Sequence, residues 1–231
     1  MKKRIKILIA ADSIAMPRAE NVYENTWVFM LKEAFPGCDI IDRSSRGSTT
    51  TRLVMEGGGG VDLLERYNPN LVIIQMGLAE CAPRLFKKTG FEHFFLTKLI
   101  PRSCQPVYVD FVKKRRVRSP YITDVSPDQF RSNITNYFER AEKIGTRIIT
   151  VLMHRPNRIF VFKSPHIGKN IELYNGIYKE TASRFPNVET IDPFEKDADI
   201  DALTLDELHL NRQGAEIIVS KLKDRINSIV S

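Results

Sequence analysis

Short runs of apolar residues, rich in isoleucine and valine, alternate along the chain with longer segments whose apolar residues recur at helical spacing. Strands that are apolar throughout are typical of parallel sheets, because helices cover both faces of such a sheet. The pattern predicts five strands, at residues 5–11, 39–43, 71–76, 147–153 and 188–191. It therefore predicts an α/β fold, a three-layer sandwich built on a five-stranded parallel sheet.

Four segments between and after these strands predict helices, at residues 19–35, 127–144, 171–185 and 211–230. Proline or glycine follows each of the first three, and both residue types commonly end helices. The last segment places its apolar residues on one face, which we expect to pack on the sheet. These residues are Ala215, Ile218, Val219, Leu222, Ile226 and Ile229.

No internal repeat or change of composition divides the 231 residues, so we expect a single domain over 1–231. Residues at about 80–126 form its least regular part, with several prolines and many aromatic residues. A connection this long is usually functional or disordered, and its aromatic content predicts an ordered, cap-like insertion over the carboxyl ends of the strands. The glycines at 57–60 lack the ending of a phosphate-binding loop and predict a flexible turn.

Composition excludes several classes of protein. The three cysteines contain no C-x-x-C pair, which indicates neither a disulfide framework nor a zinc site. Lys6 interrupts the first apolar run, so a buried strand is favoured over a secretory signal, and no run is long enough to span a membrane. We expect a reduced, cytoplasmic protein without metal or cofactor.

The net charge of +7 and a pI near 9.3 raise the question of an acidic partner. The densest basic run is at residues 113–118, but no recognition helix, zinc finger or RNA-binding motif accompanies it. It is interpreted as a solvated loop or as a strip facing an anionic substrate, and nucleic acid is not an expected partner.

Candidate catalytic residues lie near the two ends of the chain. Ser13 follows the first predicted strand, where a serine can be a nucleophile or simply a helix cap or turn residue. Asp206 and His209 precede the last predicted helix, and three-residue spacing in a turn lets the carboxylate orient the imidazole. His154 and His166, after the fourth strand, are expected to be exposed polar residues, with substrate contact as the alternative.

In their order and placement these residues resemble the motifs of the SGNH, or GDSL-type, hydrolases over essentially the whole chain. The resemblance implies a flavodoxin-like SGNH fold in which Ser13 is the nucleophile and Asp206 and His209 complete the triad. It also implies that Gly47 donates its amide to the oxyanion. Ala11 stands where the family usually has glycine in its first block.

The third block departs from the family pattern. Ala79 takes the place of an asparagine that donates to the oxyanion, so the hole must use main-chain amides or another donor such as Arg84. The run from Gln75 to Arg84 is similar to a variant found in bacterial surface-polysaccharide pathways, which implies a carbohydrate substrate, often O-acetylated. Cys81 in this run is interpreted as a packing residue rather than a nucleophile.

The sequence thus predicts a serine esterase acting on an O-acylated carbohydrate or other acylated small molecule. Two alternatives remain open, an O-acyltransferase using the same triad and a glycan-binding or assembly component with little turnover. The acyl group, the sugar and the oligomeric state are not readable from the sequence.

Overall fold

A computed structural model describes residues 4–55, 60–83, 91–116 and 123–230. Its centre is a parallel sheet of five strands in the order β2-β1-β3-β4-β5, the order of flavodoxin-like folds. The strands are β1 (Lys6–Ala11), β2 (Asp39–Asp42), β3 (Leu71–Gln75), β4 (Arg147–Val151) and β5 (Val188–Ile191). The predicted fold class is confirmed, and every predicted strand is present to within two residues at its ends.

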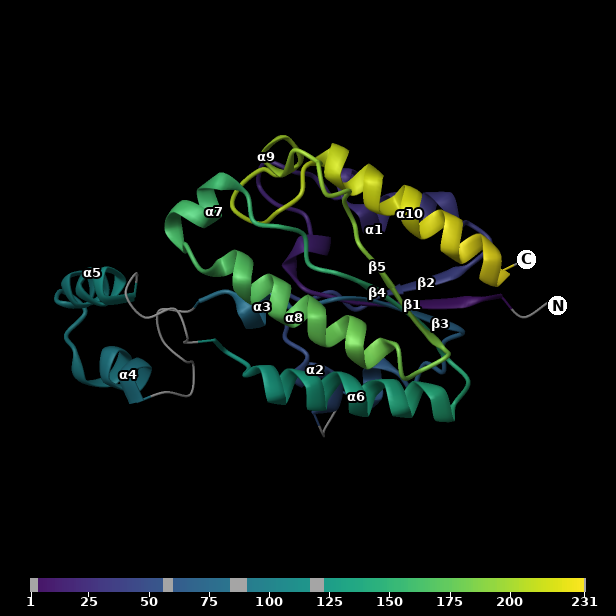
Figure 1. The fold of residues 1–231 in the computed structure, drawn as a ribbon, viewed down its shortest axis with the longest axis horizontal. Helices are drawn as coiled ribbons and strands as arrows, with labels where there is room; N and C mark the ends of the chain where they lie inside the picture. Colours follow the sequence, from purple (N-terminus) through teal and green to yellow (C-terminus); the bar gives the residue numbers. More distant parts are fainter. Residues whose placement is uncertain (1–3, 56–59, 84–90, 117–122, 231) are drawn as a thin grey trace.

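Helices cover both faces of this sheet, which gives three layers (Figure 1). One face carries α1 (Trp27–Ala34) and α10 (Arg212–Val230), and the other carries α6 (Pro127–Lys143) and α8 (Ile167–Ala182). Strands β1 and β3 are buried almost throughout, whereas the edge strands β2 and β5 are partly exposed. Burial on both faces is the reason the inner strands are apolar runs without alternation.

Shorter elements complete the chain. They are the α-helices α2 (Thr51–Val54), α3 (Leu78–Cys81), α4 (Phe91–Phe94), α5 (Gln105–Arg116), α7 (Arg158–Lys163) and α9 (Ile200–Leu203), a π-helical turn (Phe95–Leu99), and the 3-10 turns Ser13–Ala15, Tyr23–Asn25 and Val61–Leu63.

The helix predicted over 19–35 is wrong in its first part. The helix begins only at Trp27, where the side chain of Thr26 accepts a hydrogen bond from the amide of Phe29 (3.2 Å). Before it, Arg18 and Asn21 form an isolated antiparallel bridge, and a 3-10 turn follows. Tertiary contacts therefore hold residues 18–25 in turns, although their composition is compatible with a helix.

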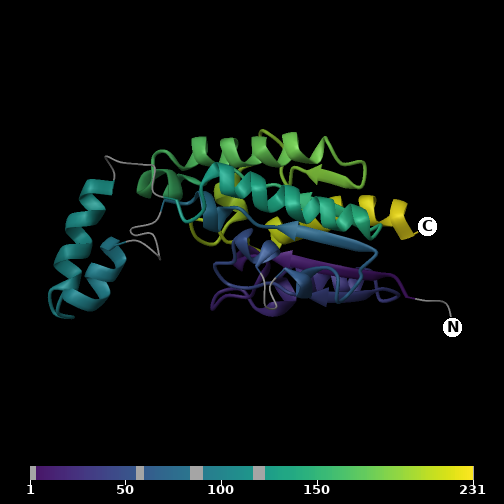
Figure 2. The same ribbon diagram turned by 90° about the horizontal axis from the view of Figure 1, so that it is seen from below.

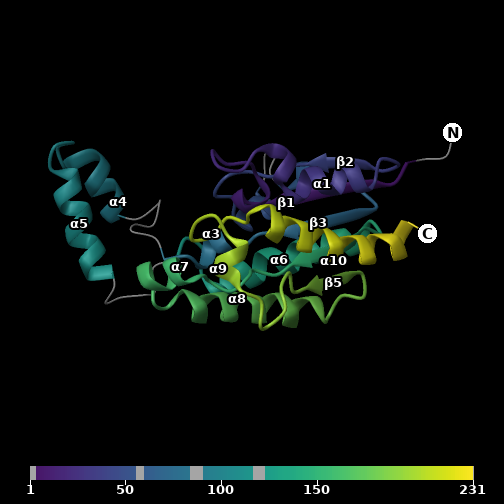
Figure 3. The same ribbon diagram turned by 90° about the horizontal axis from the view of Figure 1, so that it is seen from above.

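The segment at about 80–126 contains α3, α4, the π-helical turn and α5, joined through residues that lie outside the described ranges. Figures 2 and 3 show α4 and α5 standing apart from the sheet and its covering helices, on the side of the molecule where α3 and α7 lie. A role for this segment as a cap over the site stays a prediction. Residues 57–59 of the glycine run also lie outside the described ranges.

Candidate active site

Ser13 lies where the chain leaves the carboxyl end of β1. The amide of Asp12 donates to the carbonyl of Gln75 in β3 (3.0 Å), and the Asp12 carboxylate accepts from the amide of Ile14 (2.9 Å). These two bonds fix a 3-10 turn that begins with Ser13 and leaves its side chain partly exposed. The serine is thus held at the edge of the sheet where ligands bind in open α/β folds.

Asp206 and His209 lie in the loop between α9 and α10. One carboxylate oxygen of Asp206, Oδ1, accepts from the amides of Leu208 and His209 (both 2.8 Å), and Oδ2 lies 2.7 Å from Nδ1 of His209. A bridge between Thr204 and Leu210 closes the base of this loop. The three-residue spacing therefore places carboxylate and imidazole together within one tight turn.

The fold brings this turn to Ser13, although 196 positions separate the serine from the histidine. Ser13 Oγ lies 3.1 Å from His209 Nε2, and the other ring nitrogen faces Asp206. A serine in reach of an imidazole whose second nitrogen is held by a carboxylate is the arrangement that activates a hydroxyl nucleophile.

Burial and neighbouring charges set the protonation of this relay. Burial would raise the pKa of Asp206, but its hydrogen bonds from the amides of His209 and Leu208 and from the imidazole lower it. The pKa of His209 is lowered, first by burial and then by the positive charges of Arg18 and Arg46, against the opposing effect of Asp206. His209 is therefore neutral at pH 7 and able to accept the proton of Ser13.

Of the three residues that the sequence connected with the oxyanion, the structure describes Gly47 and Ala79. Gly47 follows β2 in a turn with a φ of +62°, a conformation that favours glycine. Within the described ranges, no acceptor is assigned to the amide of Gly47 or to that of Ser13. Ala79 lies in α3 and has no side-chain donor, while Arg84 lies outside the described residues.

Glu80 and Cys81, the next residues of α3, are completely buried. The carboxylate of Glu80 accepts from the amide of Thr50 through Oε1, and for Oε2 no partner is found in the described part of the chain. Burial, with a contribution from Asp12, raises the pKa of Glu80 to about 7 despite the bonds from Thr50. Cys81 Sγ lies 3.7 Å from the sulfur of Met153, as expected of a packing residue.

Arg18 and Asn157, which the sequence did not mark, and His154, which it did, support or border the site. Arg18 places its guanidinium against Nε2 of His209, beside Ser13. His154 is only 3% exposed, so the expectation of an exposed residue is wrong, and its Nε2 lies 2.9 Å from the carbonyl of Leu208. Asn157 donates to the carbonyl of Asp206 (2.6 Å). Because both contacts cross to the Asp206 loop from after β4, no local signal could have revealed them.

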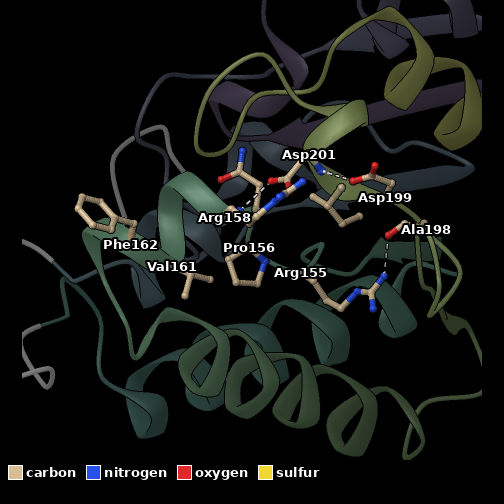
Figure 4. A pocket seen from close by; sticks show the side chains of 10 residues that line it. Arg155, Pro156, Arg158, Val161, Phe162, Ala198, Asp199 and Asp201 are labelled. Carbon is tan, nitrogen blue, oxygen red and sulfur yellow. Dashed lines mark hydrogen bonds and ion pairs between the residues drawn. The ribbon is translucent and has the colours of Figure 1, made fainter.

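A hollow of about 520 Å³ lies between the segment after β4 and the α9 region (Figure 4). Its charged groups already have partners. Arg158 binds Asp201, and Arg155 donates to three main-chain carbonyls. None of Ser13, Asp206 and His209 lines this hollow, so it is not the reaction site. Asn157, which does line it, supports the back of the Asp206 loop through its hydrogen bond to the carbonyl of Asp206.

Comparisons with solved structures find the same fold over essentially the whole chain at low sequence identity. The chain is similar to a putative acylhydrolase from Bacteroides fragilis (TM-score 0.64, 16% identity, covering 100% of this chain and 90% of that one). It is also similar to a GDSL-like lipase from Bacteroides thetaiotaomicron (0.62, 17%, 99% and 90%). A third similar structure is a catalytic mutant of the acetylxylan esterase Axe2 from Geobacillus stearothermophilus (0.62, 15%, 98% and 96%).

No protein-family model matches the chain. No curated protein matches it either. In the described ranges, no helix is both long and apolar enough to cross a membrane, and no three His, Cys, Asp or Glu side chains gather as metal ligands. The resemblance to the solved structures extends from β1 to α10 and includes enzymes described as GDSL-like, so the fold of this chain is that of the GDSL-type, or SGNH, hydrolases.

Proposed function

We propose that the protein is a serine esterase in which Ser13, His209 and Asp206 form the catalytic triad. The observation that carries the proposal is the continuous relay from Asp206 through both ring nitrogens of His209 to Ser13 Oγ. Ser13 Oγ attacks the ester carbonyl while Nε2 of His209 takes its proton. Asp206 stabilises the imidazolium, which then gives the proton to the departing alcohol oxygen. Water, activated by the same imidazole, releases the acyl group from Ser13.

The negative oxygen of the tetrahedral intermediate needs donors that are already in place. The amides of Ser13 and Gly47 suit this role, because both are close to the carboxyl end of β1 and neither has an assigned acceptor in the described ranges. Ala79 supplies no side-chain donor. Loss of one such donor costs roughly 100- to 1000-fold in turnover, so we expect slow hydrolysis unless Arg84 or another group substitutes.

The proposed substrate is an O-acylated carbohydrate, with acetyl as the acyl group. Two observations support it. The motif from Gln75 to Arg84 resembles that of polysaccharide-pathway proteins, and one of the structures with this fold is an acetylxylan esterase. Transfer of the acyl group to a sugar hydroxyl is the second candidate, because the same triad can pass the acyl group to either acceptor, and the missing donor at Ala79 would slow both reactions alike.

A serine-directed fluorophosphonate tests the nucleophile directly. We expect the intact chain to be labelled, Ser13→Ala to remain unlabelled, and the exposed-site control Ser183→Ala to be labelled as the wild type is. In parallel, Ser13→Ala and His209→Ala should lose several orders of magnitude in p-nitrophenyl acetate hydrolysis, whereas His166→Ala should not. Full activity in both Ser13→Ala and His209→Ala, at matched purity and thermal midpoint, would rule out the triad.

Acyl transfer is separated from hydrolysis by supplying a sugar acceptor. Mass spectrometry of the products then distinguishes free acetate from an acetylated sugar. Acetate as the sole product, at a rate that the acceptor does not change, would favour the esterase over the transferase.

A further inference from the structure

Two arginines from different loops converge beside the nucleophile. Arg18 follows the turn that contains Ser13, and Arg46 directly precedes Gly47 in the loop after β2. Arg18 contacts His209 Nε2 through Nη2, and Arg46 donates from Nη2 to the carbonyl of Pro17 (3.0 Å), the residue before Arg18. Both positive charges therefore lie at the same side of the candidate site.

The position of Arg18 is fixed by a rigid support. Its main chain pairs with Asn21 in both directions (2.8 and 3.1 Å). Asn21, which is only 5% exposed, donates from its side chain to the carbonyl of Leu210, the neighbour of His209 (3.3 Å). The bridge at Arg18 and Asn21 thus connects the serine loop to the histidine loop and holds the guanidinium at the imidazole.

Neither guanidinium has a carboxylate partner within ion-pair distance among the residues that the structure describes. Nε of Arg18 is buried and has no acceptor there. Burial lowers the pKa of Arg18, and the charge of Arg46 lowers it further, although Asp206 and Asp12 oppose this. An anion bound between Arg18 and Arg46 would offset the repulsion of their two positive charges and would offer an acceptor to Nε of Arg18.

We propose that Arg18 and Arg46 form a subsite for a carboxylate or phosphate group on the alcohol part of the ester. The proposal deepens the proposed esterase function and rests on it. Its substrate class is an O-acylated acidic sugar, either a uronate or a sugar phosphate. An arginine fork matches the paired oxygens of both groups, which lysine does not do as well.

The proton route assigns the anion to the alcohol rather than to the acyl group. His209 Nε2 gives its proton to the departing alcohol oxygen, so that oxygen must come within hydrogen-bond distance of Nε2. Arg18 contacts this same nitrogen. Substrate groups within reach of the Arg18 guanidinium therefore belong to the alcohol part of the ester. When Arg18 turns to the anion, the lone pair of Nε2 is left to Ser13 alone.

Matched esters test this assignment. We compare kcat/KM for acetylated galacturonate, acetylated galactose 6-phosphate and acetylated galactose, together with a hemisuccinate ester of galactose that carries its charge on the acyl side. We expect the wild type to prefer at least one of the two acidic-sugar esters over acetylated galactose by about 10-fold, and to show no such preference for the hemisuccinate. The better of the two esters identifies the anion as carboxylate or phosphate.

Substitutions then locate the preference. Arg18→Gln and Arg46→Gln should each reduce the ratio of acidic to neutral kcat/KM by about 5- to 10-fold, and Arg18→Lys should restore part of it. Arg184→Gln is the matched control, because Arg184 pairs with Glu180 on an exposed surface beyond the C-terminal end of α8. Equal kcat/KM for all acetyl esters, a preference for the hemisuccinate, or an unchanged ratio in both glutamine variants would overturn the proposal.

A binding measurement separates failure of this inference from failure of the esterase function. By calorimetry, galacturonate or galactose 6-phosphate should bind the wild type at least about 10-fold more tightly than galactose, and Arg18→Gln should remove the difference. Tighter binding of the acidic sugar, lost in Arg18→Gln, without any ester turnover would refute the esterase function and support the anion subsite. Turnover of esters without any charge preference would refute only the subsite.

Discussion

Replacing Glu80 by glutamine should change the stability of the protein, relative to the wild type, more favourably at pH 8 than at pH 5. Glu80 is completely buried in α3, and burial raises its pKa to about 7 from an ordinary value of 4.5. The folded state therefore binds a proton that the unfolded state has lost between these two values. The stabilising contribution of the protonated group is complete below pH 4.5 and is lost as the pH rises through 7.

The magnitude follows from the size of the shift. One pKa unit corresponds to about 1.4 kcal/mol, so the contribution of Glu80 to the free energy of unfolding falls by about 2.5 kcal/mol between pH 5 and pH 8. Glutamine does not titrate. The difference in unfolding free energy, Glu80→Gln minus wild type, should thus be about 2.5 kcal/mol more favourable at pH 8 than at pH 5.

Urea unfolding of both proteins at the two pH values measures this difference, and titration of other groups largely cancels in the subtraction. Glu65→Gln is the matched control, because the pKa of Glu65 is shifted in the opposite direction. Burial would raise the pKa of Glu65, but the hydrogen bonds and charge of Arg140 lower it, so its contribution is lost only as the pH falls below 4.5 and the Glu65→Gln difference should stay nearly constant between pH 5 and pH 8. A Glu80→Gln difference that stays constant within about 0.5 kcal/mol would refute an uncharged, buried Glu80.

Three further predictions concern catalysis. Because burial and the two nearby arginines lower the pKa of His209, the acid limb of the pH profile of kcat/KM for p-nitrophenyl acetate should lie below the ordinary value of 6.5; a limb at or above that value contradicts the assignment. Ala79→Asn should raise turnover toward roughly 100-fold if the oxyanion hole lacks a donor. No change, joined to a large loss in Arg84→Ala, places the substitute donor on Arg84, and silence of both variants argues against the third block in the site. Changing residues 113–116 together to serine should weaken an anionic ester more than a neutral one, with a difference that shrinks in salt; equal effects on both esters would remove the electrostatic argument.

The sequence by itself determined the elements whose signal is local. Burial on both faces makes the inner strands continuous apolar runs, and these were located to within two residues. The helix α6 was predicted closely because Ser126 and Pro127 mark its start and Gly145, with a φ of +71°, follows its end. The pairing of Asp206 with His209 was also readable, since the two residues are three positions apart.

Contacts between distant parts of the chain decided the rest. The helix expected from residue 19 begins only at Trp27, because Asn21 is held by the carbonyl of Leu210, 189 positions away. The same folding buries His154 and brings Arg18 to His209 across 191 positions. Composition and spacing report on neighbours within a few residues, whereas burial, charge neighbours and pKa depend on which loops the sheet brings together at its carboxyl edge. The sequence could therefore supply the reacting groups, and only the tertiary structure placed the charges that surround them.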